Sequence, residues 1–397
     1  MPEGVIVREG STDILVPELH SSGGPGKIQG GVFFNEQMAF NRDVSVMLLR
    51  ALGRDSITVA DAMTATGSRA VRIANEVKGT VVTANDYSED AIPFIERNIE
   101  LNGLSNCRAS NMDLHMLFAE ESFDYVDLDP FGSPIPYLQS AIRGCRKHGI
   151  LAITATDTAP LAGAHAPKCR RRYQSEPVRG YMCHEGGLRI LMCSIARELA
   201  KFDRGMKPLL SFYADHYFRT YIQVEEGAEK ADRTLAQLGY MEYNTETLER
   251  SVSDRYDPTH KYGPFWLGPL HDQEFVSSMD PAGMATEKRC TKYLNLWKNE
   301  LDTEVFVYDM SELSSHIKMS PPKLADFIDL LNSNGKASFT HICPTSFKTD
   351  LPLDTVVSLY RECSPDSKHR FRCARARVKD YMLLPHTWMQ VPYTCRV

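Results

Sequence analysis

Three features that define other classes of protein are missing from this chain of 397 residues. No apolar run is long enough to span a bilayer, which argues against a membrane protein. Residues 1–10 are polar and lack the apolar centre of a secretory signal peptide, so we expect a cytoplasmic protein. The 10 cysteines include no Cys-x-x-Cys pair, the usual spacing of structural zinc sites, so we expect reduced thiols and no bound metal.

The chain also lacks internal repeats and low-complexity tracts, and what it has instead is a regular alternation of two kinds of segment. Short β-branched and apolar runs predict strands at 56–62, 80–84, 123–128 and 149–155. Apolar residues at helical spacing predict helices at 44–52 and 69–77, and a third helix runs from the N-cap and acids of 88–90 to Asn102-Gly103. Alternating strands and helices indicate an α/β, Rossmann-like domain whose parallel sheet is covered on both faces.

The sequence changes character after about residue 266. Ser320-Pro321-Pro322 has the N-cap and first-turn proline of a helix, and the apolar residues that follow recur at helical spacing. Asn334-Gly335 ends that helix, and 336–342 reads as a strand. We therefore predict a catalytic domain over residues 1–265 and a smaller α+β domain over residues 266–397.

Acidic residues follow the predicted strands, at the edge where open α/β sheets bind their ligands. They are Asp61, Asp86, Asp129 and Asp157. Because the carboxyl ends of parallel strands meet at one edge, we expect these four side chains to lie along a single rim. This arrangement predicts a nucleoside-binding site in the first domain.

The turn after the first strand is not the glycine-rich turn of dinucleotide-binding proteins. Residues 61–67 contain only Gly67, which counts against a nicotinamide-dependent oxidoreductase, since NAD needs a clear helix N-terminus for two phosphates. The turn suits S-adenosylmethionine, which has no phosphate and carries a carboxylate and a sulfonium. We predict cofactor contacts from Asp61 in this turn, from Asp86 to the ribose, and from Met112-Asp113 to the adenine.

Two arginines are candidates for binding the carboxylate of that cofactor. Arg42 and Arg69 each offer a guanidinium, which pairs with a carboxylate in a bidentate fork. A surface ion pair is the alternative for each of them.

The tetrapeptide Asp129-Pro130-Phe131-Gly132 is the most specific feature of the chain. An exocyclic base amine is a poor nucleophile, and a carboxylate such as Asp129 raises its reactivity by accepting its N–H. Pro130 fixes the backbone so that a carbonyl can accept the second N–H, and Phe131 offers a face for stacking a base. A simple turn after a strand is the alternative, but its place in the sheet favours catalysis of methyl transfer to a nucleobase amine.

Basic residues gather in two places although the net charge is −6. Residues 168–172 with Arg179 form one cluster, and residues 368–379 form a second with no acid inside it. Either could be a solvated surface, but two such clusters favour a phosphate-backbone partner.

Several segments together resemble the tRNA guanine-26 N2-dimethyltransferase family, in its compact archaeal-type branch. The segments are Phe33-Phe34-Asn35, Met38-Ala39, Asn41-Arg42-Asp43, 127–134, 154–157, Cys183-His184-Glu185, 215–219 and 262–270. The family's four-cysteine zinc site, which some members carry, has no counterpart in residues 249–261.

The resemblance implies transfer of one or two methyl groups to N2 of guanine 26 in tRNA, with tRNA held partly by the C-terminal domain. It implies that Asp129 is the catalytic carboxylate, that Phe131 contacts the base, and that Phe33 is a second aromatic in the pocket. It also implies cofactor contacts from Arg42, Arg69, Asp86 and Met112-Asp113. We expect a monomer without an obligate protein partner, and Cys183-His184-Glu185 to be structural.

Three other functions remain open at this stage. An amino-methyltransferase acting on another tRNA guanine or on an adenine would use the same tetrapeptide. A nicotinamide-dependent oxidoreductase lacks its phosphate turn here, and a purely RNA-binding protein leaves Asp129 unexplained.

Overall fold

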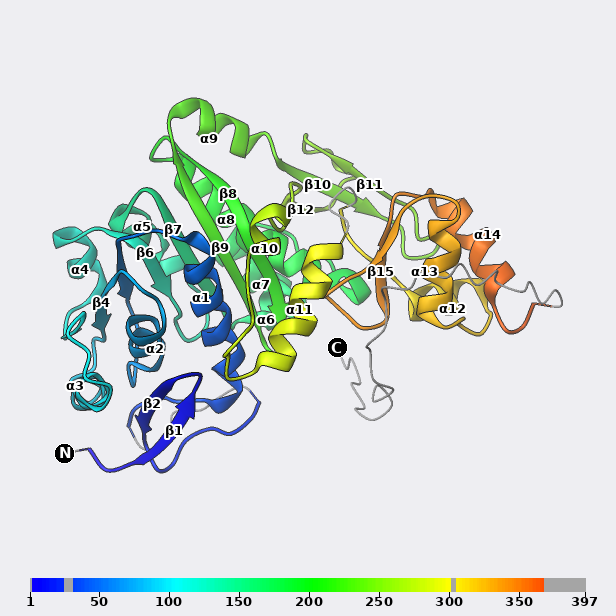
Figure 1. Cartoon of the computed structure of the whole chain (residues 1–397). Helices are drawn as coiled ribbons and strands as arrows, with labels where there is room; N and C mark the ends of the chain where they lie inside the picture. The colour runs from blue at the N-terminus through cyan, green and yellow to red at the C-terminus, as the bar shows by residue number, and fades with distance from the viewer. Residues whose placement is uncertain (1, 25–30, 301–304, 368–397) are drawn as a thin grey trace.

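The structure, a computed structural model of the whole chain, describes residues 2–24, 31–300 and 305–367 (Figure 1). The basic segment 368–379 therefore lies outside the described residues, as does part of the loop predicted at 21–31. No helix in the described ranges is long and apolar enough to cross a bilayer.

A seven-stranded sheet in the order β5-β4-β3-β6-β7-β9-β8 forms the centre of the molecule. Strands β3 to β7 pair in parallel, and β9 is antiparallel to both β7 and β8. The bounds are β3 Ile57–Asp61, β4 Thr80–Asn85, β5 Cys107–Ser110, β6 Phe123–Leu128, β7 Cys145–Ala155, β8 Arg204–Ala214 and β9 Tyr217–Glu226. The predicted parallel α/β sheet is confirmed.

Helices cover both faces of this sheet because alternate strand residues are apolar on each side. Val59 and Val82 pack into one apolar cluster with helices of the first face, and Ala60 and Val126 pack into a second cluster on the other face. The helices of the first face are α1 Ala39–Leu52, α2 Ser68–Glu76 and α3 Ile92–Leu101. Those of the second are α4 Leu114–Glu120, α5 Ile135–Gly144 and α8 Cys183–Ala200.

Short elements complete the part of the chain around the large sheet. They are β1 Val5–Glu9, β2 Thr12–Val16, α6 Thr158–Leu161, α7 Ala166–Tyr173, α9 Ala228–Leu235, and a three-stranded sheet of β10 Leu238–Tyr243, β11 Arg250–Ser253 and β12 Tyr262–Trp266. The β1–β2 hairpin is held to α3 by Asn98, which bonds to both the N–H and the carbonyl of Leu15.

A small α+β unit forms the C-terminal end and has its own apolar cluster around Phe327, Phe347 and Tyr360. It contains β13 Tyr308–Asp309, β14 Ala337–Phe339, β15 Ser346–Thr349, α12 Met310–Ile317, α13 Leu324–Asn332 and α14 Leu353–Cys363. Between it and the large sheet lie α10 Gln273–Ser277 and α11 Glu287–Asn299 (Figure 1).

The packing of α10 and α11 bears on where the two domains meet. Val276 and Trp297 of these helices belong to the apolar cluster of α1 and the large sheet rather than to that of the small unit. The boundary near residue 266 stays a prediction, and this packing favours a division closer to residue 300.

Among the element ends that differ from those predicted, three have a local cause. The helix expected to open at Ser88 begins at Ile92, because Asp86 Oδ1 accepts the Ser88 N–H in a preceding turn. The helix expected at Ser320 begins at Leu324, since the Ser320 N–H is bonded to Asp366. The strand expected at 336–342 stops at Phe339, because the next residues turn to bond Glu300.

Candidate active site

The four predicted carboxylates do lie along one edge of the large sheet. Asp61 ends β3, and Asp86, Asp129 and Asp157 follow β4, β6 and β7. These strands are parallel neighbours, with Asp61 paired to Ala84 and to Asp127. The rim is therefore built by the carboxyl ends of adjacent strands, as the sequence predicted.

The tetrapeptide after β6 presents an aromatic ring to solvent beside a half-buried carboxylate. Pro130 is buried, the Asp129 side chain is 17% exposed, and Phe131 is 60% exposed. The Phe33 ring stands edge-on to Phe131, with ring centroids 4.7 Å apart. The two aromatics predicted for the base pocket are thus brought together although they are far apart in sequence.

Hydrogen bonds from the end of β7 fix the shape of this loop. The Gly132 N–H donates to Thr156 Oγ1 at 2.6 Å, and the Thr156 N–H donates to the Gly132 carbonyl at 2.9 Å. Gly132 has φ 85°, a conformation that favours glycine. Ser133 Oγ donates to Tyr173 Oη, which donates to Asp157 at 2.5 Å. The loop is therefore clamped from two sides, which preorganises Asp129.

Arg69 is the residue that holds Asp129. Its Nη2 donates to Asp129 Oδ2, and its Nη1 donates to Asn41 and Ser45 at 2.8 and 2.9 Å. Its Nε lies 3.5 Å from Asp127 Oδ1. Among the described residues no hydrogen bond reaches Asp129 Oδ1, so one oxygen of the carboxylate remains available to a substrate amine. The guanidinium predicted to bind the cofactor thus contacts Asp129, the carboxylate predicted to be catalytic.

A second arginine, which the sequence analysis did not single out, binds the Asp127 carboxylate that lies next to Arg69. Arg219 of β9 is fully buried and donates to both oxygens of Asp127, at 3.0 and 2.5 Å. Burial raises the pKa of Asp127, but Arg219 and Arg69 outweigh it and hold the pKa below its usual value. Asp127 is therefore a buried anion that orients Arg69, and only the antiparallel pairing of β9 brings Arg219 to it.

Asp61 has a different electrostatic environment from its neighbour. Burial and the nearby Asp127 raise its pKa to about 7, although Arg69 opposes the shift, and its Oδ2 accepts from Thr64 Oγ1 at 2.5 Å. Because this side chain is only 2% exposed, its oxygens stabilise the first turn by internal contacts rather than facing solvent.

Asp86 and Met112 lie where a nucleoside on this rim would need them. Asp86 is partly exposed, and its Oδ2 accepts from the Ala65 N–H of the first turn at 2.8 Å. The side chain of Asn85 bonds to both the N–H and the carbonyl of Met112, which joins the ends of β4 and β5. Asp113 is exposed and caps α4 by accepting from the His115 N–H.

The geometry disfavours the role predicted for Arg42. Its Nε and Nη2 donate to the two oxygens of Glu9 at 2.8 and 2.5 Å, and Nη2 also reaches the Asn35 carbonyl. This bidentate pair is almost fully buried. The Arg42 guanidinium, which the sequence analysis assigned to a cofactor carboxylate, is thus already paired with Glu9 of β1.

Two buried polar atoms at the rim fit a bound ligand. Asn41 Nδ2 and Thr66 Oγ1 have no hydrogen-bond partner among the described residues. Buried donors of this kind are rare without a partner. Together with the partly exposed carboxylate of Asp86, they give the rim donors and an acceptor suited to the amino-acid and ribose groups of S-adenosylmethionine.

Other polar groups lie outside this site. His184 stacks on Tyr213 with ring centroids 4.0 Å apart, burial lowers its pKa to about 4, and Glu185 is paired with Arg189. These contacts favour the structural role predicted for Cys183-His184-Glu185.

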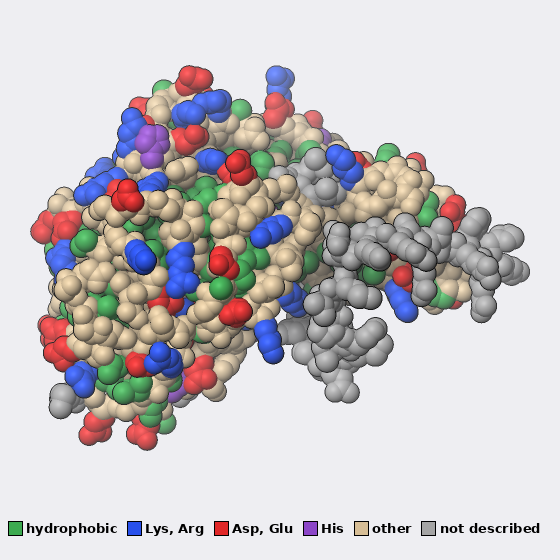
Figure 2. All heavy atoms as spheres, in the orientation of Figure 1, with side chains coloured by type: hydrophobic (Ala, Val, Ile, Leu, Met, Phe, Trp, Pro, Cys, Tyr) green, Lys and Arg blue, Asp and Glu red, His purple; other side chains and the backbone are tan. Residues whose placement is uncertain are grey.

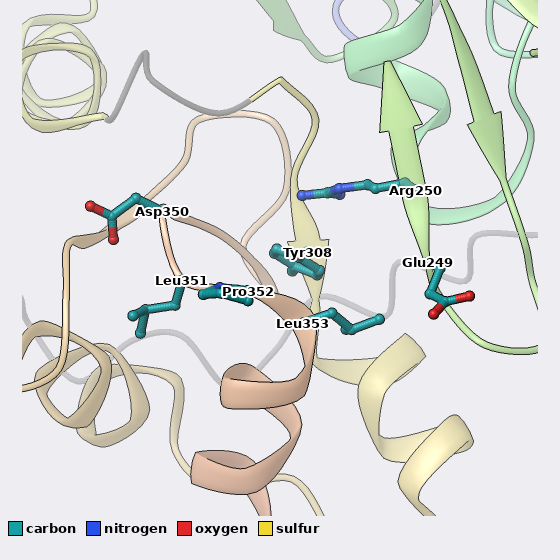
Figure 3. A pocket seen from close by; sticks show the side chains of 7 residues that line it. All are labelled: Glu249, Arg250, Tyr308, Asp350, Leu351, Pro352 and Leu353. Atoms are coloured by element: carbon teal, nitrogen blue, oxygen red, sulfur yellow. The ribbon is translucent and has the colours of Figure 1, made fainter. Parts of the chain in front are cut away.

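A cavity of about 290 Å³ lies where β11 meets the small C-terminal unit (Figure 3). Arg250 points across it, lies 3.9 Å from the ring of Tyr308, and donates to the carbonyls of Phe306 and Val307. Since that guanidinium is already engaged, the cavity is better explained as a joint between two parts of the chain than as a reaction site.

Three features define the class of this protein as an S-adenosylmethionine-dependent methyltransferase. They are the mainly parallel sheet with the antiparallel strand β9 near one end, the first turn without the glycines that bind a diphosphate, and the tetrapeptide held by hydrogen bonds after β6. Comparisons with known proteins place it more narrowly. The profile of the N2,N2-dimethylguanosine tRNA methyltransferase family matches residues 10–361, and the chain belongs to that family.

Individual relatives agree with this assignment. The chain is 40% identical over 381 residues to the tRNA (guanine(26)-N(2))-dimethyltransferase of Pyrococcus abyssi, covering 90% of this chain and 98% of that protein. It is 36% identical over 375 residues to the Methanosarcina mazei enzyme of the same name, covering 87% and 96%. The solved structure of Trm1 from Pyrococcus horikoshii with S-adenosyl-L-methionine superimposes with a TM-score of 0.83 at 37% identity, covering 89% of this chain and 99% of that one.

Proposed function

We propose that this protein transfers methyl groups from S-adenosylmethionine to the exocyclic N2 of guanine 26 in tRNA, giving mono- and dimethylguanosine. The cofactor supplies an electrophilic methyl group, and the chain supplies the acceptor for the amine protons. The observation that carries the proposal is the clamped Asp129, with one oxygen bonded to Arg69 and the other without a hydrogen-bond partner among the described residues. A guanine amine is recognised by such an acceptor, and family membership supplies the substrate class.

The other residues of the tetrapeptide position the base. We assign the Pro130 carbonyl to the second N–H of the amine, and the ring of Phe131, with Phe33 against its edge, to stacking on the guanine. Arg69 and Asp127 act on Asp129 rather than on the substrate. We assign Asp86, Met112 and Asp113 on the rim to cofactor binding, and the buried Asp61 to holding the first turn beside the cofactor. Transfer of labelled methyl groups to unmodified tRNA, followed by nucleoside analysis, tests the proposal.

Removal of the Asp86 carboxylate should weaken cofactor binding. A charged hydrogen bond is worth about 1.5–3 kcal/mol, so Asp86→Ala should lower affinity for S-adenosylhomocysteine roughly 10–150-fold in calorimetry. Asp90→Ala removes an exposed acid from the same segment and should leave the affinity unchanged. Affinities within twofold of each other in the two variants would exclude the ribose role of Asp86.

Helix α7 is the surface we assign to the tRNA backbone. On the face shown in Figure 2, basic and acidic side chains are interspersed, and no broad basic area is seen there. We therefore assign the binding of tRNA phosphates to a local cluster of basic residues. The α7 helix carries Arg170, Arg171 and Arg172, and its Tyr173 contacts Ser133 of the catalytic loop. Arg171 and nearby Arg179 are exposed, which places two cations beside the rim.

Loss of these two charges should weaken tRNA binding in a salt-dependent way. Each phosphate contact contributes about one unit to the slope of log K against log salt, so Arg171→Ala/Arg179→Ala should lower that slope by about two. The control Lys78→Ala/Lys147→Ala removes two exposed charges at the amino ends of β4 and β7, on the opposite edge. Filter binding at several salt concentrations compares them, and equal slopes in the two variants would exclude α7 from the interface.

We place the enzyme in the cytoplasm, where a tRNA substrate is found, and we expect it to act as a monomer without an obligate protein partner. Size-exclusion chromatography with light scattering tests the oligomeric state.

A further inference from the structure

A buried cluster of three metal-ligand side chains lies far along the chain from the catalytic rim. His271 belongs to the segment between β12 and α10, Glu300 follows α11, and His341 follows β14. Each offers a ligand atom within 4.8 Å of the others. Their side chains are 3%, 1% and 0% exposed. The cluster thus joins three segments that are well separated in sequence.

The imidazoles of this cluster are short of partners. Both ring nitrogens of His271 and the Nε2 of His341 have no hydrogen-bond partner among the described residues. Unpaired buried polar groups are rare, so three of them in one place favour a further partner for these rings. His271 Nε2 lies 4.0 Å from Glu300 Oε2, which is beyond hydrogen-bond distance.

Glu300 and His341 place two possible ligand atoms side by side. Glu300 Oε2 accepts from His341 Nδ1 at 2.6 Å, and a metal ion bound by both atoms would displace the proton between them.

We propose that His271, Glu300 and His341 bind one divalent metal ion of the zinc class. Two imidazoles and a carboxylate are a known donor set for zinc. Ligand atoms around a tetrahedral zinc lie about 3.4 Å apart, so His271 Nε2 must approach Glu300 Oε2 from 4.0 Å, and His341 Nδ1 must move away from it from 2.6 Å. Glu300 Oε1 accepts from Thr340 Oγ1 and lies 3.1 Å from Lys348 Nζ, which leaves Oε2 to the ion. Glu185, 3.7 Å from Lys348, offers that cation another carboxylate. The bound ion would hold the small C-terminal unit against α11 and β12.

This site has no signature in the sequence. The absence of paired cysteines predicted a metal-free protein, but ligands separated by 29 and 41 positions form no recognisable spacing (271, 300 and 341). Only the fold brings them together.

Metal analysis of the untagged full-length protein tests the proposal without reference to methylation. After treatment with a chelator and loading with zinc, the protein should retain about one ion per chain by mass spectrometry, and Co²⁺ should give visible absorption of a tetrahedral site. Zinc should also raise the melting temperature by more than about 5 °C.

Three variants locate the ion. His271→Gln and His341→Gln should each lose retained zinc and weaken Co²⁺ binding more than about 10-fold. His316→Gln, on α12 outside the cluster, should behave as the wild type. Wild-type protein that retains no zinc, shows no Co²⁺ spectrum and melts unchanged would overturn the proposal, and the cluster would then hold water only. The wild-type measurements decide this even if the variants fail to fold.

Discussion

Asp129→Asn should lower kcat for methyl transfer about 10²–10⁴-fold, the usual contribution of a positioned proton acceptor. The substitution keeps the shape of the side chain but removes the charge that stabilises the amine as it becomes cationic. Because Phe131 and the cofactor residues are untouched, we expect KM for tRNA and affinity for S-adenosylhomocysteine to change only a few-fold. Single-turnover assays with labelled cofactor separate these quantities.

A fold control accompanies that measurement. Arg69 keeps Asn41, Ser45 and Asp127 as partners in this variant, so its thermal unfolding should stay close to that of the wild type. A correctly folded Asp129→Asn enzyme that works at nearly the wild-type rate would show that the carboxylate is not the catalytic acceptor.

Arg219→Met should destabilise the protein more than any surface substitution in the sheet. It leaves Asp127 as a buried anion whose remaining contacts among the described residues are the hydrogen bond from Tyr125 Oη and the longer contact to Arg69, and breaking a buried ion pair from one side costs about 3–5 kcal/mol. The same change should lower methylation, because Asp127 then no longer holds Arg69 in place against Asp129. Denaturant unfolding gives the free-energy difference.

The matched control is Arg108→Met. Arg108 of β5 is paired with Glu121, but both side chains are about half exposed, and such pairs contribute about 0–1 kcal/mol. If the two variants lost similar free energies of unfolding, Arg219 could not be the central cation of this network.

The sequence predicted those parts of the site that depend on local pattern. Strand ends followed by acids placed Asp61, Asp86 and Asp129 on one rim, because parallel strands share an edge. The sequence analysis assigned Phe131 to stacking on a base, and the structure shows its ring 60% exposed.

Contacts that depend on tertiary packing were not predictable in the same way. An isolated arginine gives no sign of which carboxylate it will meet, so Arg42 and Arg69 were both assigned to the cofactor, whereas they contact Glu9 and Asp129. Arg219 was quoted within a family segment without a role, since only the antiparallel placement of β9 reveals one. A signal was available, because an arginine in the middle of an apolar strand must meet a buried anion.

The most direct test of the whole account is mass spectrometry of nucleosides from a single tRNA incubated with the enzyme and S-adenosylmethionine. With guanine at position 26, we predict N2-methylguanosine and N2,N2-dimethylguanosine. The same tRNA with adenine at position 26 should stay unmodified. Methylated adenosine, or equal methylation of both transcripts, would contradict the assignment of this site to N2 of guanine 26.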